Sequence, residues 1–424
     1  MMAKQNTLTT VPRLRFPEFR SAKDWTTIEL RQLSEFVTER VGATDCTPYT
    51  VSAGVGLVSQ QEKLGRTIAG NSLKNYIVLQ KNDFAYNKSA TKAFPQGFIA
   101  KYVGEDRAAV PNSIFTCFRT NDDLIDPTYL DNLFSTNLHG NWLRNRIAVG
   151  ARAHGSLNVS DEDLMDLPVP LPAGSSSLVE QQKIADCLTS LDEVIAAQGR
   201  IVTALKAHKR GLMQQLFPRE GETRPRLRFP EFRNAPEWEQ KAGGVLFENR
   251  KVGGEEGLPI YSVTVNDGMV QRASFERDFY DIEDPAKNKK ACKGDIAYNM
   301  MRMWQGAQGV AVEDCMVSPA YVVLSPLKGV CSGFFAYLFK LPQSLELLTA
   351  YSRGLTKDRL RLYFDDFARM QLCAPGHEEQ QRIADCLSAL DTRIAAESRQ
   401  LTALKTHKQG LMQQLFPTPE ATGA

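Results

Sequence analysis

Arginine, lysine and glutamine side chains gather at four places in the sequence. Two clusters are HGNWLRNRIAVGARAHG at 139–155 and SRGLTKDRLR at 352–361, and two more follow the segments DFAYN at 83–87 and DIAYN at 295–299. Arg and Lys suit phosphates and guanine, and Gln suits adenine in the major groove, so these clusters predict DNA contacts. The alternative is ordinary solvated surface charge. The candidate DNA-binding residues are Lys88, Lys92, Gln96, Arg144, Arg146, Arg152, Arg302, Trp304, Gln305, Gln308, Arg353, Lys357, Arg359 and Arg361.

Residue patterns that carry catalysis or bind metals do not occur in the sequence. There is no Gly-rich phosphate loop ending in Gly-Lys-Ser/Thr, and no Asp/Asn-Pro-Pro-aromatic tetrapeptide of the kind that holds a target adenine. The charged stretch EDPAKNKK at 283–290 is better interpreted as a solvated loop than as a nuclease centre. The 5 histidines and 8 cysteines are scattered, which predicts neither a metal site nor a disulfide framework. The sequence therefore favours a binding protein without catalytic residues or a cofactor of its own.

The chain is a tandem duplication. EQQKIADCL at 180–188 returns as EQQRIADCL at 379–387, and 28 of the 39 aligned positions from there to GLMQQLFP are identical. PRLRFPEFR at 12–20 also returns unchanged at 225–233, followed each time by an acidic residue and a tryptophan. We call this nine-residue segment the box. A repeat of this length indicates two copies of one structural unit.

The segments 21–176 and 234–376 have diverged, yet they share a frame. DFAYN and DIAYN, Gln96-Gly97 and Gln308-Gly309, and Tyr49 and Tyr261 are all separated by the same 212 positions. Short β-type runs bounded by Gly, Asn and Asp predict that both segments are rich in strands.

The repeated segments after them are expected to be long helices. Ser177 with Glu180, and Gly376 with Glu379, are spaced as capping pairs, and Pro218 and Pro417 end the pattern. Apolar residues step by four and three over more than four heptads, which is typical of a coiled-coil seam. The residues predicted to pair the helices or dock partners are Ile184, Leu188, Leu191, Ile195, Leu205, Lys209, Ile383, Leu387, Leu390, Ile394, Leu404 and Lys408.

Two polar positions interrupt each seam, Gln198 and Lys209 in the first copy and Glu397 and Lys408 in the second. If the helices pair antiparallel within the chain, a symmetric register brings Lys209 to Asp391 and Lys408 to Asp192. The alternative is that these residues lie at a frayed, wet edge.

We therefore predict an α+β fold in which two β-rich domains are joined by an intramolecular antiparallel coiled coil with pseudo-twofold symmetry. The expected division is 1–176 and 219–376 for the domains, 177–218 and 377–417 for the helices, and 418–424 for a tail. No run of 18 apolar residues and no signal pattern occurs, so a cytoplasmic location is expected. The net charge of +2 does not decide for or against nucleic acid.

The sequence resembles the specificity subunits of type I restriction–modification systems over nearly its whole length. The resemblance rests on the Phe-Pro-Glu-Phe box, the DFAYN and DIAYN strands, the linker DLPVPLP at 166–172, and the EQQ-[KR]-I-A helices ending in GLMQQLF. The second copy departs at its linker, where QLCAPGHEEQ replaces the Pro-Leu-Pro form.

The resemblance implies that each variable segment is a target recognition domain reading one half of a bipartite double-stranded DNA site. It also implies that the helices set the gap between the halves and dock two methyltransferase subunits, with motor-nuclease subunits in the full complex. Adenine-N6 methylation and ATP-dependent cleavage in phage defence would then belong to those subunits, together with S-adenosylmethionine, ATP and Mg.

Two alternatives remain open from the sequence. One is a reader of the same build that serves another phage-exclusion system, which copurification with its partners would distinguish. The other is a structural coiled-coil protein that does not touch DNA. The helix surfaces repeated within one chain, beside divergent globular segments, argue against the second alternative.

Overall fold

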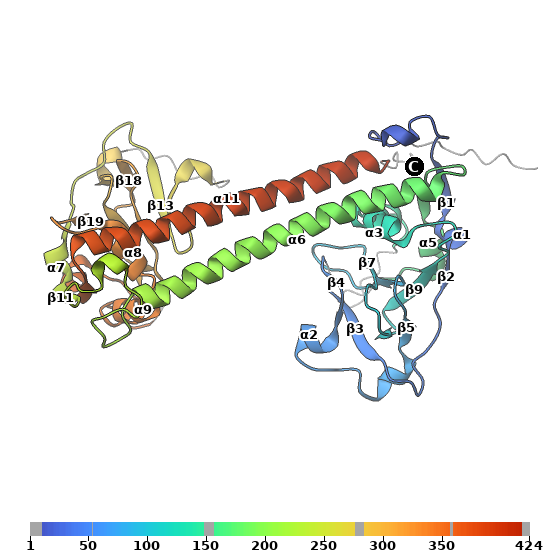
Figure 1. The fold of residues 1–424 in the computed structure, drawn as a ribbon, viewed down its shortest axis with the longest axis horizontal. Coiled ribbons are helices and arrows are strands. Elements are labelled where there is room, and N and C mark those ends of the chain that lie inside the picture. Colours follow the sequence, from blue (N-terminus) through green and yellow to red (C-terminus); the bar gives the residue numbers. More distant parts are fainter. Residues whose placement is uncertain (1–10, 53, 148–156, 276–283, 357–358, 418–424) are drawn as a thin grey trace, which may run out of the picture. The chain divides into compact units, whose positions relative to one another are not determined.

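The computed structural model describes residues 11–417 except 53, 148–156, 276–283 and 357–358. The chain forms two compact units, which we call unit 1 (residues 1–198 and 400–424) and unit 2 (residues 199–399). The two long helices, α6 (Ser177–Leu216) and α11 (His377–Leu415), each give one half to each unit (Figure 1).

Unit 1 contains two four-stranded sheets and a two-stranded ribbon. The first sheet has the order β2-β9-β6-β7 and is antiparallel throughout. The second has the order β4-β3-β8-β5, in which β3 and β8 are parallel. The strands are β1 (Thr26–Glu29), β2 (Ser34–Phe36), β3 (Thr47–Ser52), β4 (Gly56–Ser59), β5 (Ile77–Leu79), β6 (Phe84–Asn87), β7 (Phe98–Lys101), β8 (Ala108–Val110), β9 (Phe115–Thr120) and β10 (Pro168–Leu171), and β1 pairs with β10.

Short helices cover these sheets and connect them to α6. They are α1 (Leu30–Leu33), α2 (Gln60–Leu64), α3 (Pro127–Ser135), α4 (Leu138–Leu143) and α5 (Asp161–Met165), with the 3-10 turns η1 (Pro17–Phe19) and η2 (Gly70–Asn75). Asp126 caps α3, because its side chain accepts hydrogen bonds from the N–H groups of Thr128 and Tyr129. The main core joins sheet, short helices and long helices in one cluster that includes Phe84, Phe118 and Leu188. Burial of this apolar surface attaches the globular part to the helices.

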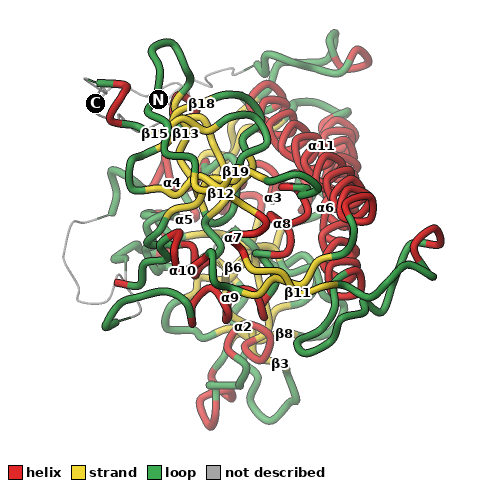
Figure 2. Tube along the Cα trace, turned by 90° about the vertical axis from the view of Figure 1, so that its left-hand side faces the viewer, coloured by secondary structure: helices red, strands yellow, loops and turns green. Residues whose placement is uncertain are grey.

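Unit 2 repeats the same sheet topology with different side chains. Figure 2 colours the strands of both units yellow and the helices red. Its sheets have the orders β12-β19-β16-β17 and β14-β13-β18-β15, with the ribbon β11-β20. The strands are β11 (Glu239–Ala242), β12 (Phe247–Asn249), β13 (Ile260–Thr264), β14 (Gly268–Gln271), β15 (Lys289–Ala291), β16 (Ile296–Asn299), β17 (Gln308–Val310), β18 (Cys315–Val317), β19 (Tyr321–Pro326) and β20 (Gln371–Ala374). Strands β6 and β16, which carry DFAYN and DIAYN, hold the same place in their sheets. The common frame predicted from the 212-residue offset is confirmed.

The helices of unit 2 hold the same places in the element order as those of unit 1, except that a 3-10 turn at Arg272–Ser274 stands where unit 1 has α2. They are α7 (Gly243–Leu246), α8 (Ser332–Leu338), α9 (Pro342–Ala350) and α10 (Phe364–Phe367), with the 3-10 turns η3 (Pro230–Phe232), η4 (Arg272–Ser274), η5 (Pro285–Lys287) and η6 (Met303–Gln305). The core again combines sheet, short-helix and long-helix residues, among them Phe247, Phe335 and Leu387.

The two long helices pair in the antiparallel register that the sequence predicted. In unit 2 the Lys209 Nζ donates to both oxygens of Asp391 at 2.5 and 2.7 Å. In unit 1 the Lys408 Nζ donates to both oxygens of Asp192 at 2.6 Å. Such partly exposed ion pairs each contribute about 0–1 kcal/mol, so their main effect is on register rather than stability.

The seam is buried most deeply where a globular part covers it. Ile184, Leu188, Ile383 and Leu387 are buried. The remaining apolar seam residues predicted to pair the helices are half-buried, namely Leu191, Ile195, Leu205, Leu390, Ile394 and Leu404. A two-helix seam exposes the flanks of its own side chains, so partial burial is expected along its open stretch.

Candidate nucleic-acid interface

The repeated Glu of each EQQ segment forms a buried ion pair with the repeated box. Arg15 donates to both carboxylate oxygens of Glu180 at 2.7 Å, and their side chains are 8% and 1% exposed. Arg228 makes the same bidentate contact with Glu379 at 2.8 and 2.6 Å. These glutamates were expected to form capping pairs, and that interpretation was wrong. Burial beneath the box directs their carboxylates to a guanidinium instead of to the helix N–H groups.

The next residue of the EQQ segment fastens the long helix to the globular part. Gln181 Oε1 accepts a hydrogen bond from the N–H of Asp126 at 2.9 Å, just before α3. Gln380 Oε1 accepts from the N–H of Cys331 at 3.0 Å, just before α8. Both contacts are to backbone groups, so they do not depend on the side chains of the variable segment.

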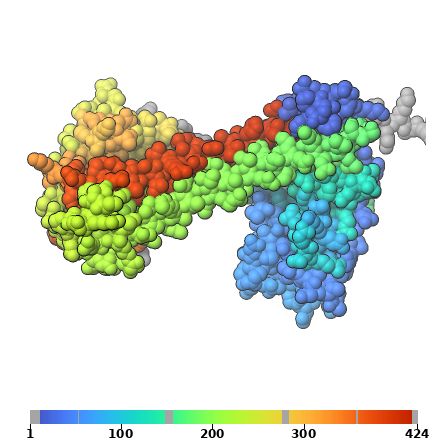
Figure 3. Space-filling model, viewed as in Figure 1, coloured from blue at the N-terminus to red at the C-terminus, as the bar shows by residue number. Residues whose placement is uncertain are grey.

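Each box also reaches the far end of the other long helix. Leu14 N donates to Gln414 O at 2.9 Å, and Leu227 N donates to Gln215 O at 2.9 Å. In Figure 3 the blue N-terminal residues lie against the red end of α11 and the green start of α6. The start of one helix, the end of its partner and a β-rich part are thus joined at each box.

Both repeats are visible in the sequence, but the contact between the box arginine and the EQQ glutamate was not predicted from it. The signal was present, because an Arg and a Glu that are each repeated verbatim, 213 and 199 positions apart, fit a shared contact. We call this arrangement of box arginine, EQQ glutamate and EQQ glutamine the junction.

One backbone hydrogen bond in each unit lies beside two of the cationic clusters predicted from the sequence. In unit 1, Leu157, which follows the 139–155 region, donates its N–H to Lys88 O at 2.7 Å, at the start of the loop after β6. In unit 2, Leu362 N donates to Met300 O at 3.0 Å, which joins the 352–361 region to the loop after β16. Lys88 and Met300 each follow the strand's final asparagine. In each unit, the residue just beyond one cationic segment thus contacts the first residue after the DFAYN or DIAYN strand.

The loops after β6 and β16 begin with the same turn. Asn87 Oδ1 accepts from Ser89 N at 2.9 Å, and Asn299 Oδ1 accepts from Met301 N at 3.0 Å. An asparagine side chain that bonds the backbone two residues on sets such a turn. The final Asn of DFAYN and DIAYN thus sets the backbone turn at the start of each loop.

In unit 1 the predicted DNA-binding side chains differ in their exposure and in the contacts that they already make. Lys88 Nζ donates to Asp161 at 2.7 Å. Burial opposes ionisation of Asp161, but hydrogen bonds from Lys88 and Thr116 outweigh it and lower the pKa of that carboxyl. Lys92 and Arg144 are exposed, and Gln96 is half-buried. Arg146 is exposed and lies over the Trp142 ring, 3.2 Å from its centroid, and Arg152 lies outside the described residues.

In unit 2 four of the predicted arginines reach the surface. Arg302, Arg353, Arg359 and Arg361 are all exposed, and Arg353 donates to the buried Asp366 at 2.6 Å. Lys357 lies outside the described residues.

Some predicted residues of the loop after β16 lie at the surface, and one lies in the core. Gln305 is exposed, and Trp304 is half-buried with its Nε1 donating to Met301 O at 3.0 Å. Gln308 was predicted to contact DNA, but its side chain is fully buried and its amide donates to Ala336 O at 2.7 Å. Its side chain holds α8 against β17 and is not at the surface.

No family model matches the sequence. The chain is 23% identical over 341 residues to a putative type I restriction enzyme specificity subunit of Methanocaldococcus jannaschii, covering 76% of this chain and 74% of that one. It is 26% identical over 164 residues to the HindI specificity subunit of Haemophilus influenzae, covering 36% and 35%.

Solved structures share the fold over almost the full length. The specificity subunit from M. genitalium matches with a TM-score of 0.56 and 14% identity, over 96% of this chain and 99% of that one. A chain from a study of complex assembly in a type I restriction–modification system matches with a TM-score of 0.50 and 19% identity, over 93% and 97%. The chain is thus similar in sequence to type I specificity subunits and shares the fold of one of them.

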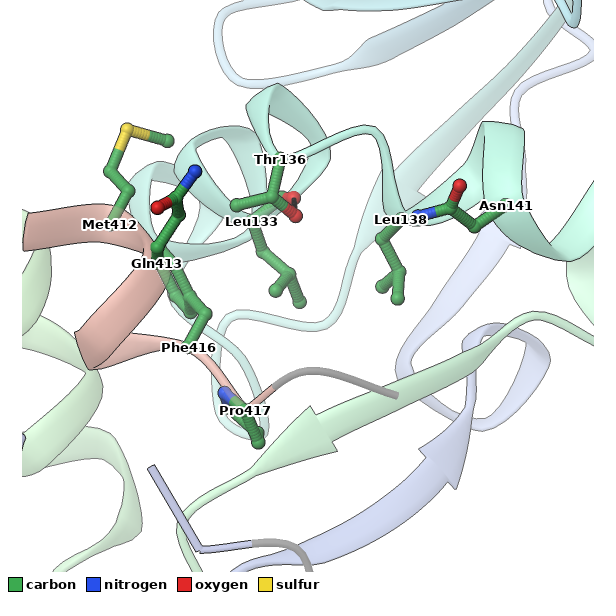
Figure 4. A pocket seen from close by; sticks show the side chains of 8 residues that line it. All are labelled: Leu133, Thr136, Leu138, Asn141, Met412, Gln413, Phe416 and Pro417. Atoms are coloured by element: carbon green, nitrogen blue, oxygen red, sulfur yellow. Dashed lines mark hydrogen bonds between the residues drawn. The ribbon is translucent and has the colours of Figure 1, made fainter. Parts of the chain in front are cut away.

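The described residues contain no cluster of His, Cys, Asp and Glu that would hold a metal ion. None of the described helices is long and apolar enough to cross a membrane. A pocket of about 140 Å³ lies between α3, α4 and the end of α11 (Figure 4). Leu133 and Leu138 line one side of it, and Met412 and Phe416 line the other. Ligand pockets usually measure about 300–1,000 Å³, so this one is a packing gap beside the helix end.

A buried histidine is expected to make unit 1 sensitive to acid. His139 is 2% exposed and its Nε2 lies 3.4 Å from Gly97 O, at the end of the loop after β6. Burial lowers the pKa of His139 to about 4. The unfolded chain takes up this proton near pH 6.5 and the folded chain only near pH 4, so stability is lost as the pH falls through that window.

We expect unit 1 to lose on the order of 2 kcal/mol of stability from His139 between pH 7.5 and pH 5. Urea denaturation at both pH values, followed by hydrogen exchange in the 88–97 loop, measures this loss. In His139→Gln the pH dependence should be weaker by that amount. An unchanged pH dependence in the variant would contradict the assignment.

Proposed function

We propose that this chain is the DNA sequence-recognition subunit of a type I restriction–modification complex, and that each β-rich part reads one half of a bipartite target. One observation carries the proposal: both units have the same strand order, and in each the end of one cationic segment is followed by a residue that bonds to the loop after the corresponding strand. Arg and Lys on a protein surface bind phosphates, and Arg and Gln read base edges.

The proposed contact residues are the surface members of the predicted set. Side chains that already bond to a neighbouring residue, such as Lys88 and Arg353, are suited to hold phosphates in a fixed position. Exposed side chains such as Lys92, Arg302 and Gln305 are suited to adapt to base edges. Arg152 and Lys357 remain part of the proposal, and Gln308 is omitted because it is buried.

We further propose that residues 1–176 and 219–376 are the two target recognition domains and that 177–218 and 377–417 are spacers. Two weak readers joined at a fixed separation gain affinity through effective concentration when the spacer matches the spacing of the half-sites. This division places one junction at each end of the helix pair.

The repeated helix surfaces support docking of the same partner twice. Lys206 and Lys405, and His208 and His407, are identical and exposed in both copies. Equivalent surfaces on a pseudo-twofold pair bind identical subunits, and we propose that these are two methyltransferase subunits. Motor-nuclease subunits would complete the complex, and S-adenosylmethionine, ATP and Mg would be bound by those partners.

The spacer role predicts a change in the target gap when the helices are shortened. Removing one heptad from each helix, residues 197–203 and 396–402, keeps the seam register and both junctions. At 1.5 Å per residue each helix shortens by about 10 Å, which corresponds to about three base pairs. The complex with its methyltransferase subunits should then methylate the same two half-sites at a shorter gap.

Sequencing of methylated DNA from cells that express each version measures the gap. Removing three residues from each helix, 199–201 and 398–400, serves as a control, because it breaks the heptad register and should abolish modification. An unchanged gap in the heptad deletion would contradict the spacer role. Failure of the intact chain to copurify with a methyltransferase would favour a reader for another phage-exclusion system.

A further inference from the structure

The loop after β16 is tied to itself and to the core of unit 2 at several points. Arg302 N donates to Asn299 O at 3.0 Å, and Arg302 O accepts from Gln305 N at 3.0 Å and from Ala307 N at 3.1 Å. Met303, inside the turn η6, is fully buried in the main core of the unit. The structure describes the whole of this loop. Its backbone therefore has one fixed shape from which side chains are presented.

Two polar side chains are exposed on this turn. They are Arg302 and Gln305, and neither side chain forms a hydrogen bond or an ion pair with another described residue. The two residues are three positions apart across a 3-10 turn, so their side chains lie on the same face of it. At a rise of about 2.0 Å per residue they are separated by about 6 Å, which is close to two base-pair steps of about 3.4 Å.

The corresponding loop of unit 1, residues 87–97, has the same length but lacks both side chains. The offset of 212 positions aligns Arg302 with Ala90 and Gln305 with Ala93. An alanine side chain has no group that can donate or accept a hydrogen bond. The frame that the two units share thus carries this polar pair in unit 2 alone. Residues that read the bases of two different half-sites are expected to differ in this way between the units.

We propose that Arg302 reads a guanine and Gln305 an adenine in the half-site of unit 2, at positions about two base-pair steps apart or less. This inference rests on the proposed DNA-reading function. The Arg302 guanidinium matches the O6 and N7 acceptors of guanine, and the Gln305 amide matches the amino group and N7 of adenine. A single turn of chain is narrow enough to enter a major groove about 12 Å wide. The fixed backbone holds the two side chains in one register against the bases.

The test uses the full chain in complex with its methyltransferase subunits, and duplexes in which each base pair of the target except the methylated ones is changed in turn. The methylation rate of each duplex gives the base preference at that position. Arg302→Ala should weaken the preference for one guanine about tenfold or more, and Gln305→Ala should do the same for a nearby adenine. Arg302→Lys should retain the guanine preference. Gln305→Glu should change the preferred adenine to cytosine, because a carboxylate accepts from the cytosine amino group.

Lys328→Ala is the matched control, because Lys328 is exposed in the same unit but follows β19 and lies outside this loop. It should leave the preference at every position unchanged. A variant without detectable methylation is assayed on the same duplexes by gel shift, which gives the preferences from binding. If both alanine variants keep every preference, or weaken all duplexes equally, the base-reading pair is overturned while the DNA-reading function stands. Failure of the wild-type complex to prefer any base pair would overturn both.

Discussion

Replacing Glu180 with alanine will lower the free energy of unfolding of unit 1 by about 3–5 kcal/mol. The substitution leaves the Arg15 guanidinium buried without a carboxylate and removes the acceptor of the Trp25 Nε1 hydrogen bond, which is 3.2 Å long. Removal of one partner from a buried ion pair is costly because the other charge stays away from water. Urea denaturation, with hydrogen exchange to separate the two units, measures the effect.

The duplication supplies an internal control. Glu379→Ala removes the same pair in unit 2, but Trp238 Nε1 has no hydrogen-bond partner among the described residues. Its cost should therefore be smaller by about one hydrogen bond, on the order of 1 kcal/mol. Gln182→Ala, on the exposed face of α6, should cost less than about 0.5 kcal/mol.

A double variant separates the effect of the unpaired Arg15 charge on stability from the effect of lost side-chain packing. Arg15→Met with Glu180→Leu removes both charges and keeps apolar volume, so it should recover much of the stability lost in Glu180→Ala. A cost below 1 kcal/mol for Glu180→Ala would show that the junction does not hold unit 1 together.

Exchange of residues 21–176 for the equivalent segment of another type I specificity subunit will change one half of the DNA target and leave the other half and the gap unaltered. The physical reason lies in the junction. Gln181 bonds to a backbone N–H before α3, and Arg15 bonds to the carbonyls of Ala22 and Lys23. Backbone groups are present whatever the donor sequence, so a foreign segment can dock on the same helix end.

Methylation mapping in cells that express the chimera measures its target. The reciprocal exchange of residues 234–376 is the matched experiment and should change only the other half. A target altered in both halves, or in neither, would contradict the modular assignment. The donor must carry its own tryptophan at the position of Trp25, because Trp25 is fully buried against Glu180.

Much of this architecture follows from periodicity and repetition. The four-three spacing of apolar residues predicted the long helices, and the shared offset of Lys209 and Lys408 predicted their antiparallel ion pairs. Both depend on spacing along one element, which a sequence records directly. The 212-residue offset likewise placed β6 and β16 at corresponding positions in two sheets.

Contacts that depend on tertiary burial were not predictable in the same way. Glu180 has the spacing of a capping residue, but the box covers it and supplies an arginine at 2.7 Å. Gln308 follows a cationic loop in the sequence, yet it turns inward to the carbonyl of Ala336. In both cases the residue type allowed two roles, and the packing of another element decided between them.

The measurement that tests the central claim most directly is the methylation pattern of host DNA with the gene for this chain intact and deleted. Single-molecule sequencing reads N6-methyladenine at every position of the genome. We predict that one two-part motif, with methyladenine in each half and a fixed unspecified gap, is present in the intact strain and absent after deletion. Retention of every such motif, in a strain whose methyltransferase subunit is expressed, would contradict the proposed function.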